Sequence, residues 1–400
     1  MSATRKASLR YAKTNSAPVE LTYKEIKTPG SQARLTDRFV LQPVIDMKAY
    51  TCRAVVDWID IVVQTKNPTQ HQWVQRAIEP TMTRKPFVEA LDAGPGKVAF
   101  RFRIRFQEPH IASVIESVRR LEEAYAFDHA PHVTALEVSI DLTPREPSNT
   151  ARGLMLGTLF RHFSPTRDVF ENYEDRPRYA WKANNGAEHV FPARKHTAFD
   201  PTVFLSADRD MAPPIDSTLY VGRKGGPSMW RLMDKIIDTQ NKEAGTYIEL
   251  SANEKRSRIE VTLDRSSLEN EGIYHLENLV GFNFTRFQKS FFQFCLPTFR
   301  LPSPGSSASL GAVQQKLEDE RLRKFLVTGI IGIKAMDAEK RRFRRLQRPA
   351  LLETLQGSGI TAPPLDRKGT GTAGTTVAFK EMNARVSMAL QKLTHREATE

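Results

Sequence analysis

The stretch KVAFRFRIRF, residues 97–106, alternates apolar and basic side chains along its length. An alternation of period two is typical of a β-strand, because successive side chains point to opposite faces of the sheet. One face of this strand is aromatic and aliphatic, and the other carries Arg101, Arg103 and Arg105. Strand geometry sets these arginines about 6.6 Å apart, which resembles the spacing of phosphates on an extended strand. The arginine face is either a nucleic-acid contact or a solvated outer surface. No acidic residue lies among the arginines, which favours the nucleic-acid contact.

A helix and a second strand follow this strand. Apolar residues recur at helical spacing over residues 110–126, which predicts an amphipathic helix. The sequence HVTALEVSIDL at 132–142 alternates again, and AVVDWIDIVVQT (54–65) and RSRIEVTLDR (256–265) are also typical of strands. A strand–helix–strand order with the helix against one face predicts an α+β fold in which the other sheet face is open.

The charge of the chain favours a polyanionic partner. The 400 residues carry a formal net charge of +13, and such a surplus is usually matched by nucleic acid, with membrane surfaces or solubility alone as competing explanations. Cys52 and Cys295 have no metal-ligand spacing, which fits a reducing cytoplasm. No apolar run reaches the roughly 18 residues of a membrane helix, and none follows the basic N-terminus. We therefore expect a cytoplasmic chain with no secretory signal and no membrane partner.

We expect three segments along the chain. Residues 1–50 are polar and basic without sustained periodicity, which predicts a flexible basic arm. Residues 51–300 hold the predicted strands and helices of a folded domain, and SPGSSAS (303–309) is typical of a linker. Residues 301–400 are then a basic tail, partly helical and partly disordered. Its run KRRFRRLQR (340–348) is either a solvated segment or a nucleic-acid-binding arm.

Phenylalanines are crowded in LVGFNFTRFQKSFFQF, residues 279–294. Such rings fill a hydrophobic core, or they stack on bases beside cations such as Arg286 and Lys289. The sequence leaves both uses open.

Carboxylates gather on the polar faces of the predicted strands. Glu137 and Asp141 share one face of their strand, and Glu260 lies with Arg258 on the polar face of another. Carboxylates that meet at one point repel each other unless a cation lies between them, and Mg²⁺ or Mn²⁺ is the usual cation for oxygen ligands. If the strands are neighbours, these carboxylates and Asp234 predict a divalent-metal site.

The stretch TLYVGRKGGPSMWRLMDK, residues 218–235, adds a nucleophile and a phosphate-binding loop. Tyr220 points to the polar side of a strand, and a tyrosine beside such a metal can attack phosphorus. The loop at 222–227 can bring backbone amides and Arg223 or Lys224 close to a phosphate. A surface hairpin is the alternative.

This order of motifs resembles the replication initiation factor family of rolling-circle plasmids and filamentous phages, to which conjugative relaxases are related. The resemblance covers roughly residues 54–300. The matched positions are an Asp-Trp strand (Asp57, Trp58), an acidic strand (Leu136, Glu137, Asp141), a Tyr-Val-Gly-Arg stretch (Tyr220, Val221, Gly222, Arg223), an Arg, Asp and Lys stretch (Arg231, Asp234, Lys235) and an Arg-x-Glu strand (Arg258, Glu260).

The resemblance implies a mainly antiparallel sheet with helices on one face, in duplicated halves, and an enzyme that nicks and rejoins one DNA strand at a replication origin. The implied catalytic residues are Tyr220, Arg231 and Lys235. Residue pattern and resemblance together assign Glu137, Asp141, Asp234 and Glu260 to Mg²⁺ or Mn²⁺, and Arg101, Arg103, Arg105, Arg223, Lys224 and Arg258 to DNA. A host helicase and a second copy of the chain are further implied partners.

Departures from the family pattern leave alternatives open. Met233 stands where the family has a tyrosine, so the nucleophile is Tyr220 or another tyrosine (Tyr173, Tyr179 or Tyr247), or is absent. Ala135 replaces the arginine before the first strand acid, and the His-hydrophobic-His endonuclease motif is missing. A catalytically silent DNA-binding initiator and a conjugative relaxase are therefore alternatives. An RNA-binding structural protein is a third, against which the paired acidic strands argue.

Overall fold

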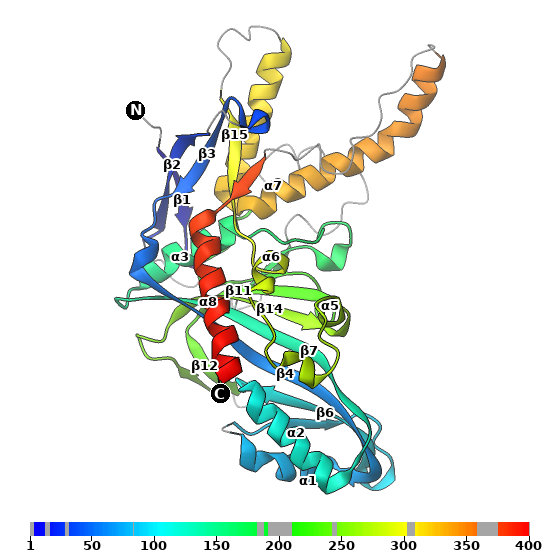
Figure 1. Ribbon diagram of the computed structural model, residues 1–400. Coiled ribbons are helices and arrows are strands. Elements are labelled where there is room, and N and C mark those ends of the chain that lie inside the picture. The colour runs from blue at the N-terminus through cyan, green and yellow to red at the C-terminus, as the bar shows by residue number, and fades with distance from the viewer. Residues whose placement is uncertain are drawn as a thin grey trace.

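The computed structural model describes residues 4–12, 17–28, 32–82, 84–181, 188–190, 210–241, 246–301, 309–357 and 375–399. These residues form two antiparallel sheets, a two-stranded ribbon and a set of helices (Figure 1). The chain has the expected α+β fold with a mainly antiparallel sheet. The duplication into two halves stays a prediction.

The larger sheet has nine strands among the described residues, and their pairings are antiparallel. In spatial order they are β5 (Phe87–Ala90), β6 (Val98–Gln107), β4 (Tyr50–Gln70), β7 (Phe127–Pro144), β14 (Arg256–Asp264), β11 (Ser228–Lys235), β10 (Thr218–Val221), β8 (Arg178–Ala180) and β9 (Glu188–Val190). β4, β6, β7 and β14 cover the four alternating stretches, and β10 and β11 form the hairpin of residues 218–235. The predicted strands are therefore neighbours in one sheet.

One face of this sheet is apolar and carries helices. Side chains such as Phe102, Ile104, Val138 and Val261 are buried on it. α1 (His71–Ile78) and α2 (Ile111–Tyr125) pack against its β4–β6 part, and α3 (Asn149–His162) and α5 (Arg265–Asn270) pack against β7 and β14. α2 is the helix that the periodicity of residues 110–126 predicted. The opposite side of the sheet, which carries the predicted arginines and carboxylates, is called the polar face below.

The phenylalanine segment is part of the core. Phe284, Phe287, Phe292 and Phe294 are fully buried around the short α6 (Arg286–Ser290). Phe282 and Phe284 make a T-shaped pair with ring centroids 5.1 Å apart, a favourable geometry for aromatic packing. Of the two uses that the sequence left open, packing is the one observed.

The N-terminal residues expected to form a flexible arm instead form strands of a second sheet. Its order is β1 (Thr4–Leu9), β2 (Val19–Lys27), β3 (Arg38–Pro43), β15 (Cys295–Arg300) and β16 (Thr376–Ala378). Leu21 and Tyr23 on β2 and Leu41 on β3 are fully buried, so each strand has an inward side of period two. Charged outer residues hid this alternation in the sequence, and the structure corrects the expected arm at residues 1–50.

The C-terminal residues expected to form a tail also belong in part to this body. β16 extends the second sheet, and α8 (Lys380–Thr399) buries Met382, Val386 and Leu390. α8 contacts β4 of the large sheet and runs across the molecule in Figure 1. A boundary after residue 300 therefore cuts through one packed unit, because buried side chains on α8 complete the core.

α7 (Ser309–Gly357) links the two sheets to a projecting segment. It packs on α3 and β15 and is broken at Gly329, which has a φ of 76°. A Cβ at Gly329 would collide with the backbone of Arg161, so glycine is required at this kink. The run at 340–348 lies in the part that points away from the body in Figure 1. Residues 303–308 of the predicted linker lie outside the described residues.

The remaining elements are short. The ribbon of β12 (Ile237–Asn241) and β13 (Thr246–Glu249) lies between β11 and β14 in the sequence. The 3-10 helices are η1 (Ala33–Leu35), η2 (Met47–Ala49), η3 (Glu79–Thr81), η4 (Pro95–Lys97), η5 (Tyr173–Asp175) and η6 (Leu276–Leu279). Within the described ranges, no helix is both long enough and apolar enough to span a bilayer.

Candidate functional site

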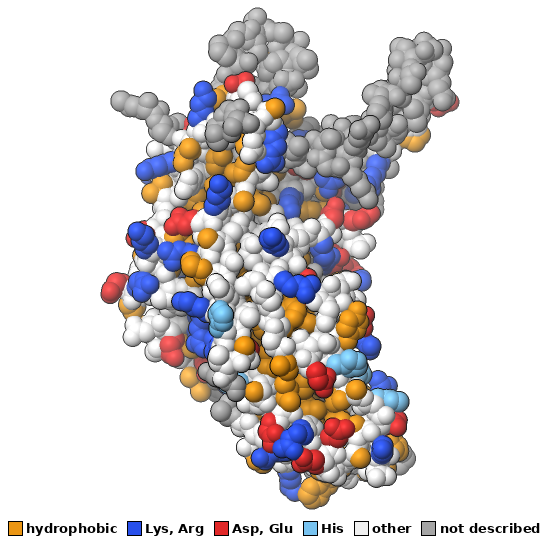
Figure 2. Space-filling model, viewed as in Figure 1, with side chains coloured by type: hydrophobic (Ala, Val, Ile, Leu, Met, Phe, Trp, Pro, Cys, Tyr) orange, Lys and Arg blue, Asp and Glu red, His pale blue; other side chains and the backbone are white. Residues whose placement is uncertain are grey.

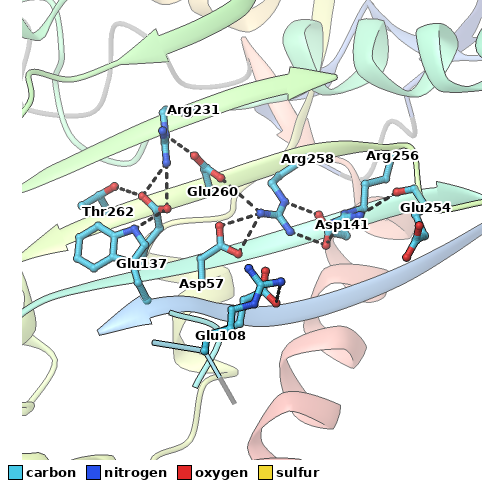
Figure 3. A network of polar contacts seen from close by, with 12 residues as sticks. Asp57, Glu108, Glu137, Asp141, Arg231, Glu254, Arg256, Arg258, Glu260 and Thr262 are labelled. Atoms are coloured by element: carbon cyan, nitrogen blue, oxygen red, sulfur yellow. Dashed lines mark hydrogen bonds and ion pairs between the residues drawn. The ribbon is translucent and has the colours of Figure 1, made fainter. Parts of the chain in front are cut away.

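Three carboxylates from three neighbouring strands meet on the polar face (Figure 3). Asp57 lies on β4, Glu137 on β7 and Glu260 on β14, and one oxygen of each lies within 4.8 Å of the others. The register brings them together, because Glu260 pairs with Ser139, two residues along β7 from Glu137. Glu137 and Glu260 are almost fully buried, and Asp57 is half-buried. We call Asp57, Glu137 and Glu260 the acidic triad.

A β-bulge lets two consecutive residues of β4 face this group. The register of β4 against β7 shifts between Val56 and Trp58, so that Asp57 is an extra residue without a partner on β7. A bulge of this kind re-aims the neighbouring side chains. Asp57 joins the triad, and Trp58, which strict alternation would place on the apolar face, donates from its indole nitrogen to Glu137 at 2.8 Å.

Arg231 on β11 joins two members of the triad. Its Nη2 donates to both carboxylate oxygens of Glu137, at 2.9 and 3.0 Å, and its Nε forms an ion pair with Glu260. Glu137 also accepts from Trp58 and from the hydroxyl of Thr262. Each oxygen of Glu137 therefore accepts two hydrogen bonds. Arg231 places a positive charge next to the triad on the side of β11.

Arg258 on β14 holds the third member. Its Nη1 donates to both oxygens of Asp57, at 2.9 and 2.7 Å, and its Nε and Nη2 donate to Asp141 at 2.6 and 2.8 Å. Arg256 forms a second ion pair with Asp141, at 2.9 Å. Arg258 is almost fully buried, so this predicted DNA-binding residue is instead part of the internal network.

The carboxylates of the network outnumber its guanidiniums by one. It contains four carboxylates (Asp57, Glu137, Asp141, Glu260) and three guanidiniums (Arg231, Arg256, Arg258). Burial, followed by the neighbouring carboxylate of Glu137, raises the pKa of Glu260 to about 8, while Arg231 opposes this shift. Glu260 therefore keeps a proton at neutral pH, chiefly because its carboxyl is buried and also because Glu137 lies beside it.

The donor set of the triad fits a hard divalent cation. It offers only oxygen ligands, which suits Mg²⁺ or Mn²⁺. The hydroxyl of Ser139, on the same face of β7, is fully buried and has no hydrogen-bond partner among the described residues. A divalent ion that replaced the proton of Glu260 would change the sum over these four carboxylates and three guanidiniums from zero to one positive charge. Each oxygen of Glu137 already accepts two hydrogen bonds, so such an ion would take the place of a donor at that residue.

The structure brings two of the four predicted metal ligands together. Glu137 and Glu260 are in the triad, whereas Asp141 is held apart from it by its ion pairs with arginines. Asp234, contrary to expectation, lies on the apolar face, because the even-numbered residues of β11 face the core. There Arg152 of α3 donates to it at 2.6 and 3.1 Å. Asp234 thus ties α3 to the sheet.

Tyr220 lies on the polar face, two strands from Glu260. It pairs with Arg231 on β11, which in turn pairs with Glu260 on β14. Neighbouring strands are about 4.8 Å apart, so the backbones of Tyr220 and Glu260 lie about 10 Å apart. A phosphate between the two side chains would bridge this separation. The guanidinium of Arg178 lies over the Tyr220 ring at 5.1 Å.

Lys235 lies further along the same side of β11 as Arg231. It is half-buried, and burial, followed by the charge of Arg258, lowers its pKa. The carboxylates of Asp57 and Glu260 act in the opposite direction, which places the ammonium group near the triad. No carboxylate of the described residues forms an ion pair with Lys235, so its charge is available to a ligand.

The other tyrosines lie elsewhere. Tyr179 is 2% exposed, in the core, and its burial raises the pKa of its phenol. Tyr173 on η5 and Tyr247 on the β12–β13 ribbon are exposed at the surface. Of the four tyrosines that the sequence offered, Tyr220 is the one whose strand register leads directly to the triad.

The three arginines of β6 are on the polar face, as predicted, but two of them have partners. Arg105 donates to both oxygens of Asp60, at 2.7 and 2.6 Å, and its guanidinium lies over the ring of Trp58 at 4.0 Å. Arg103 forms an ion pair with Glu89. Arg101 is exposed and has no ion pair among the described residues. The acids come from neighbouring strands, which the sequence of β6 alone could not indicate.

The glycine loop is a hairpin turn in which the amides of Gly222 and Arg223 have an acidic residue as partner. The backbone amides of Gly222 and Arg223 donate to the carbonyl and carboxylate of Asp175, at 2.9 and 3.0 Å. The Arg223 guanidinium pairs with Glu174 at 3.1 Å. Lys224 is exposed and has no ion pair in the described part of the chain. Asp175 and Glu174 of η5 thus occupy two amides and the guanidinium of the expected phosphate cradle, and a phosphate contact of this loop stays a prediction.

Asp57, Trp58 and Ser139 are site residues to which sequence reasoning gave no role in metal binding. Asp57 was matched only as part of a motif. Strict alternation places it on the side of the buried Ile59 and Ile61, so its position on the polar face depends on the bulge. Ser139 lies between Glu137 and Asp141 in the same alternation. The position of Trp58 depends on the bulge, for which the sequence gives no indication.

Comparison with known proteins gives distant structural likenesses alone. No protein-family model and no curated protein matches the chain. Among solved structures, the chain is similar to a rolling circle replication initiator protein from Geobacillus stearothermophilus, with 10% identity and a TM-score of 0.28, over 67% of this chain and 97% of that one. It is also similar to a 3-hydroxy-3-methylglutaryl-coenzyme A reductase of Streptococcus pneumoniae, with 13% identity and a TM-score of 0.18, over 84% and 83%. TM-scores this low assign no function to the chain.

Proposed function

We propose that the chain is a divalent-metal-dependent enzyme that nicks and rejoins one DNA strand, through Tyr220, to start rolling-circle replication. The observation that carries this proposal is the line of side chains across β10, β11 and β14, from Tyr220 through Arg231 to Glu260, on the face where Asp57 and Glu137 complete the triad. A nucleophile, a cation and a cluster of oxygen ligands at these separations match the needs of a phosphodiester transfer.

The triad would hold the metal. Asp57, Glu137 and Glu260 supply the oxygen ligands, and Glu260 loses its proton when the ion binds. The ion would polarise the phosphodiester and neutralise the charge that develops on it. Arg231 and Lys235 add fixed positive charge beside the same phosphate, on the side that faces Tyr220.

The covalent step exchanges one phosphate ester for another. The oxygen of Tyr220 attacks phosphorus and its phenolic proton passes to water, while the bond from phosphorus to the leaving sugar oxygen breaks and that oxygen takes up a proton. The product is a phosphotyrosine ester and a free sugar hydroxyl. Because the ester bond is conserved, the hydroxyl can attack it in reverse and reseal the strand.

DNA binding would use the exposed cations of the polar face and of α7. Arg101 on β6 and Lys224 in the hairpin carry no ion pair among the described residues, and the run at 340–348 projects from the body. The net charge of +13 supports a nucleic-acid partner. A replication origin as target, a host helicase and a second copy of the chain belong to the same proposal.

A nicking assay tests the proposal. The full chain is incubated with Mn²⁺ and a supercoiled plasmid that carries the origin of the element encoding the chain. Wild type is expected to relax the plasmid and to leave a covalent protein–DNA adduct on a denaturing gel. Tyr220→Phe should bind DNA and form no adduct, whereas the matched control Tyr173→Phe should behave as wild type. Adduct formation by Tyr220→Phe at the wild-type rate would place the nucleophile elsewhere.

A second candidate is a DNA-binding initiator that does not cut. Met233 occupies the place of a tyrosine in the resembling family, and Arg231 and Arg258 already pair with the carboxylates of the triad. In that case the network only stabilises the sheet. Binding of the origin without any nicking, in Mn²⁺ or Mg²⁺, is the result that would favour this candidate.

A further inference from the structure

We infer that a cavity between α8 and the start of β4 is a binding site for a phosphate group, separate from the acidic triad. The cavity has a volume of about 190 Å³ and is lined by Tyr50, Thr51 and Cys52 on β4 and by residues of α8. A water molecule takes up about 30 Å³, so the cavity has room for a phosphate and several waters.

Three cationic side chains line this cavity. Arg145 comes from the loop after β7, and Arg385 and Lys392 come from α8. The two α8 residues are seven positions apart, about two helical turns, so they lie on the same side of the helix. Arg145 Nε donates to the carbonyl of Lys48 at 3.0 Å, and Arg385 Nη1 donates to the carbonyl of Tyr50 at 3.4 Å. These bonds orient both guanidiniums without neutralising them.

The cavity has no negative charge of its own. None of its described lining residues is an acid, and no described carboxylate forms an ion pair with Arg145, Arg385 or Lys392. Burial raises the pKa of Cys52 to about 12, against the opposing charge of Arg385, and burial also raises the pKa of Tyr50 to about 12. The thiol and the phenol therefore stay neutral. Cations on both sides of the cavity match a phosphate, whose oxygens accept charge-assisted hydrogen bonds in several directions.

The cavity shares one lining residue with a larger cavity that reaches Asp141 and its arginines. A larger cavity of about 570 Å³ is lined by Asp141, Arg256 and Arg258 of the network and also by Thr51, which lines the smaller cavity as well. Figure 2 shows Lys and Arg side chains gathered along one flank of α8. A DNA strand that followed the larger cavity past Arg256 and Arg258 could thus place a phosphate in the α8 cavity. That the phosphate belongs to a DNA strand rests on the proposed function. The positive charge of the cavity is independent of that function.

The first experiment measures binding of pyrophosphate to the full chain without DNA, by calorimetry at constant ionic strength. Wild type should bind it. Lys392→Gln changes an exposed side chain that has no hydrogen bond to any described residue, and it should weaken binding at least about threefold. Arg385→Gln combined with Lys392→Gln should abolish it. The matched control is Lys289→Gln, an exposed lysine of α6, which should bind as wild type does.

The second experiment identifies the source of the phosphate. The affinity for a single-stranded oligonucleotide is measured against salt for wild type and for the double variant of Arg385 and Lys392. A bound strand predicts that the double variant lowers the slope of log affinity against log salt by about two, roughly one for each cation removed. An unchanged slope together with lost pyrophosphate binding supports a free phosphate compound as the ligand. An unchanged slope together with no pyrophosphate binding by wild type would overturn the inference. Neither measurement depends on nicking, so a chain that does not nick DNA would leave both results interpretable.

Discussion

Replacing Glu260 by glutamine should remove most of the pH dependence that the acidic triad gives to the stability of the fold. In the folded chain the carboxyl of Glu260 has a pKa of about 8, against an ordinary value of 4.5. Between these two values the folded state holds a proton that the unfolded chain has released. The free energy of unfolding of wild type therefore falls as the pH rises through this window.

The magnitude follows from the size of the shift. Each pH unit in the window lowers the free energy of unfolding by about 1.4 kcal/mol, so the full effect is on the order of 5 kcal/mol. Glu260→Gln keeps the shape of the side chain and leaves the network with three carboxylates and three guanidiniums. The variant should match wild type in stability near pH 5 and exceed it near pH 8.5.

Denaturant unfolding of both proteins at several pH values measures the effect. The control is Glu108→Gln, which removes a carboxylate from an exposed ion pair with Arg84 at 3.0 Å near the network. Its profile should run parallel to that of wild type. Addition of Mn²⁺ at about 100 times its dissociation constant should stabilise wild type by about 2.7 kcal/mol and Glu260→Gln much less. A difference between wild type and Glu260→Gln that stays constant from pH 5 to 8.5 would refute the charge excess on which the reasoning depends.

Three further predictions concern the DNA-binding surface and the packing of the body. Arg101→Ala should lower the slope of log DNA affinity against log salt by about 0.9, because one phosphate contact is lost, and an unchanged slope would show that another surface binds DNA. Asp234→Asn should lower the free energy of unfolding by about 3 kcal/mol, since Arg152 is left buried without its partner, while Mn²⁺ binding is retained; a normal stability would contradict the ion pair between α3 and the sheet. Removal of residues 380–399 should cost at least about 6 kcal/mol, about 1.5 kcal/mol for each of four buried apolar side chains of α8, and a truncated chain that still melts cooperatively at the wild-type temperature would show that α8 is dispensable.

The sequence predicted the large sheet well because its strands have one apolar and one polar side. Period-two alternation identified β6, β7 and β14, β-branched residues identified β4, and helical spacing identified α2. The N-terminal strands were missed because β1, β2 and β3 carry charged outer residues between short apolar positions. β3 pairs with β15, which lies more than 250 residues away in the sequence, and β2 packs on α3. No local pattern reports such distant contacts.

The candidate site was predicted in part, because its residues lie on strands that have one apolar and one polar side. The alternation of side chains along each strand placed Glu137, Glu260 and Tyr220 on one side of the sheet, where the structure has them. It could not tell that Asp141 and Arg258 neutralise each other inside the network, because a strand pattern gives the side of a residue and not its partners. Asp234 was assigned from a motif without regard to its face, and that face is apolar.

Mn²⁺ binding is the most direct test of the central claim, that Asp57, Glu137 and Glu260 form a divalent-metal site on the polar face. Electron paramagnetic resonance titration of the full chain at pH 8.5 should show one bound Mn²⁺. Binding should be lost in Asp57→Asn and in Glu260→Gln and kept in Asp234→Asn. For wild type, the affinity should fall about tenfold for each pH unit below about 8, because the ion and the proton compete for Glu260. No binding at millimolar Mn²⁺, or equal loss of binding in Asp234→Asn and Glu260→Gln, would contradict the claim.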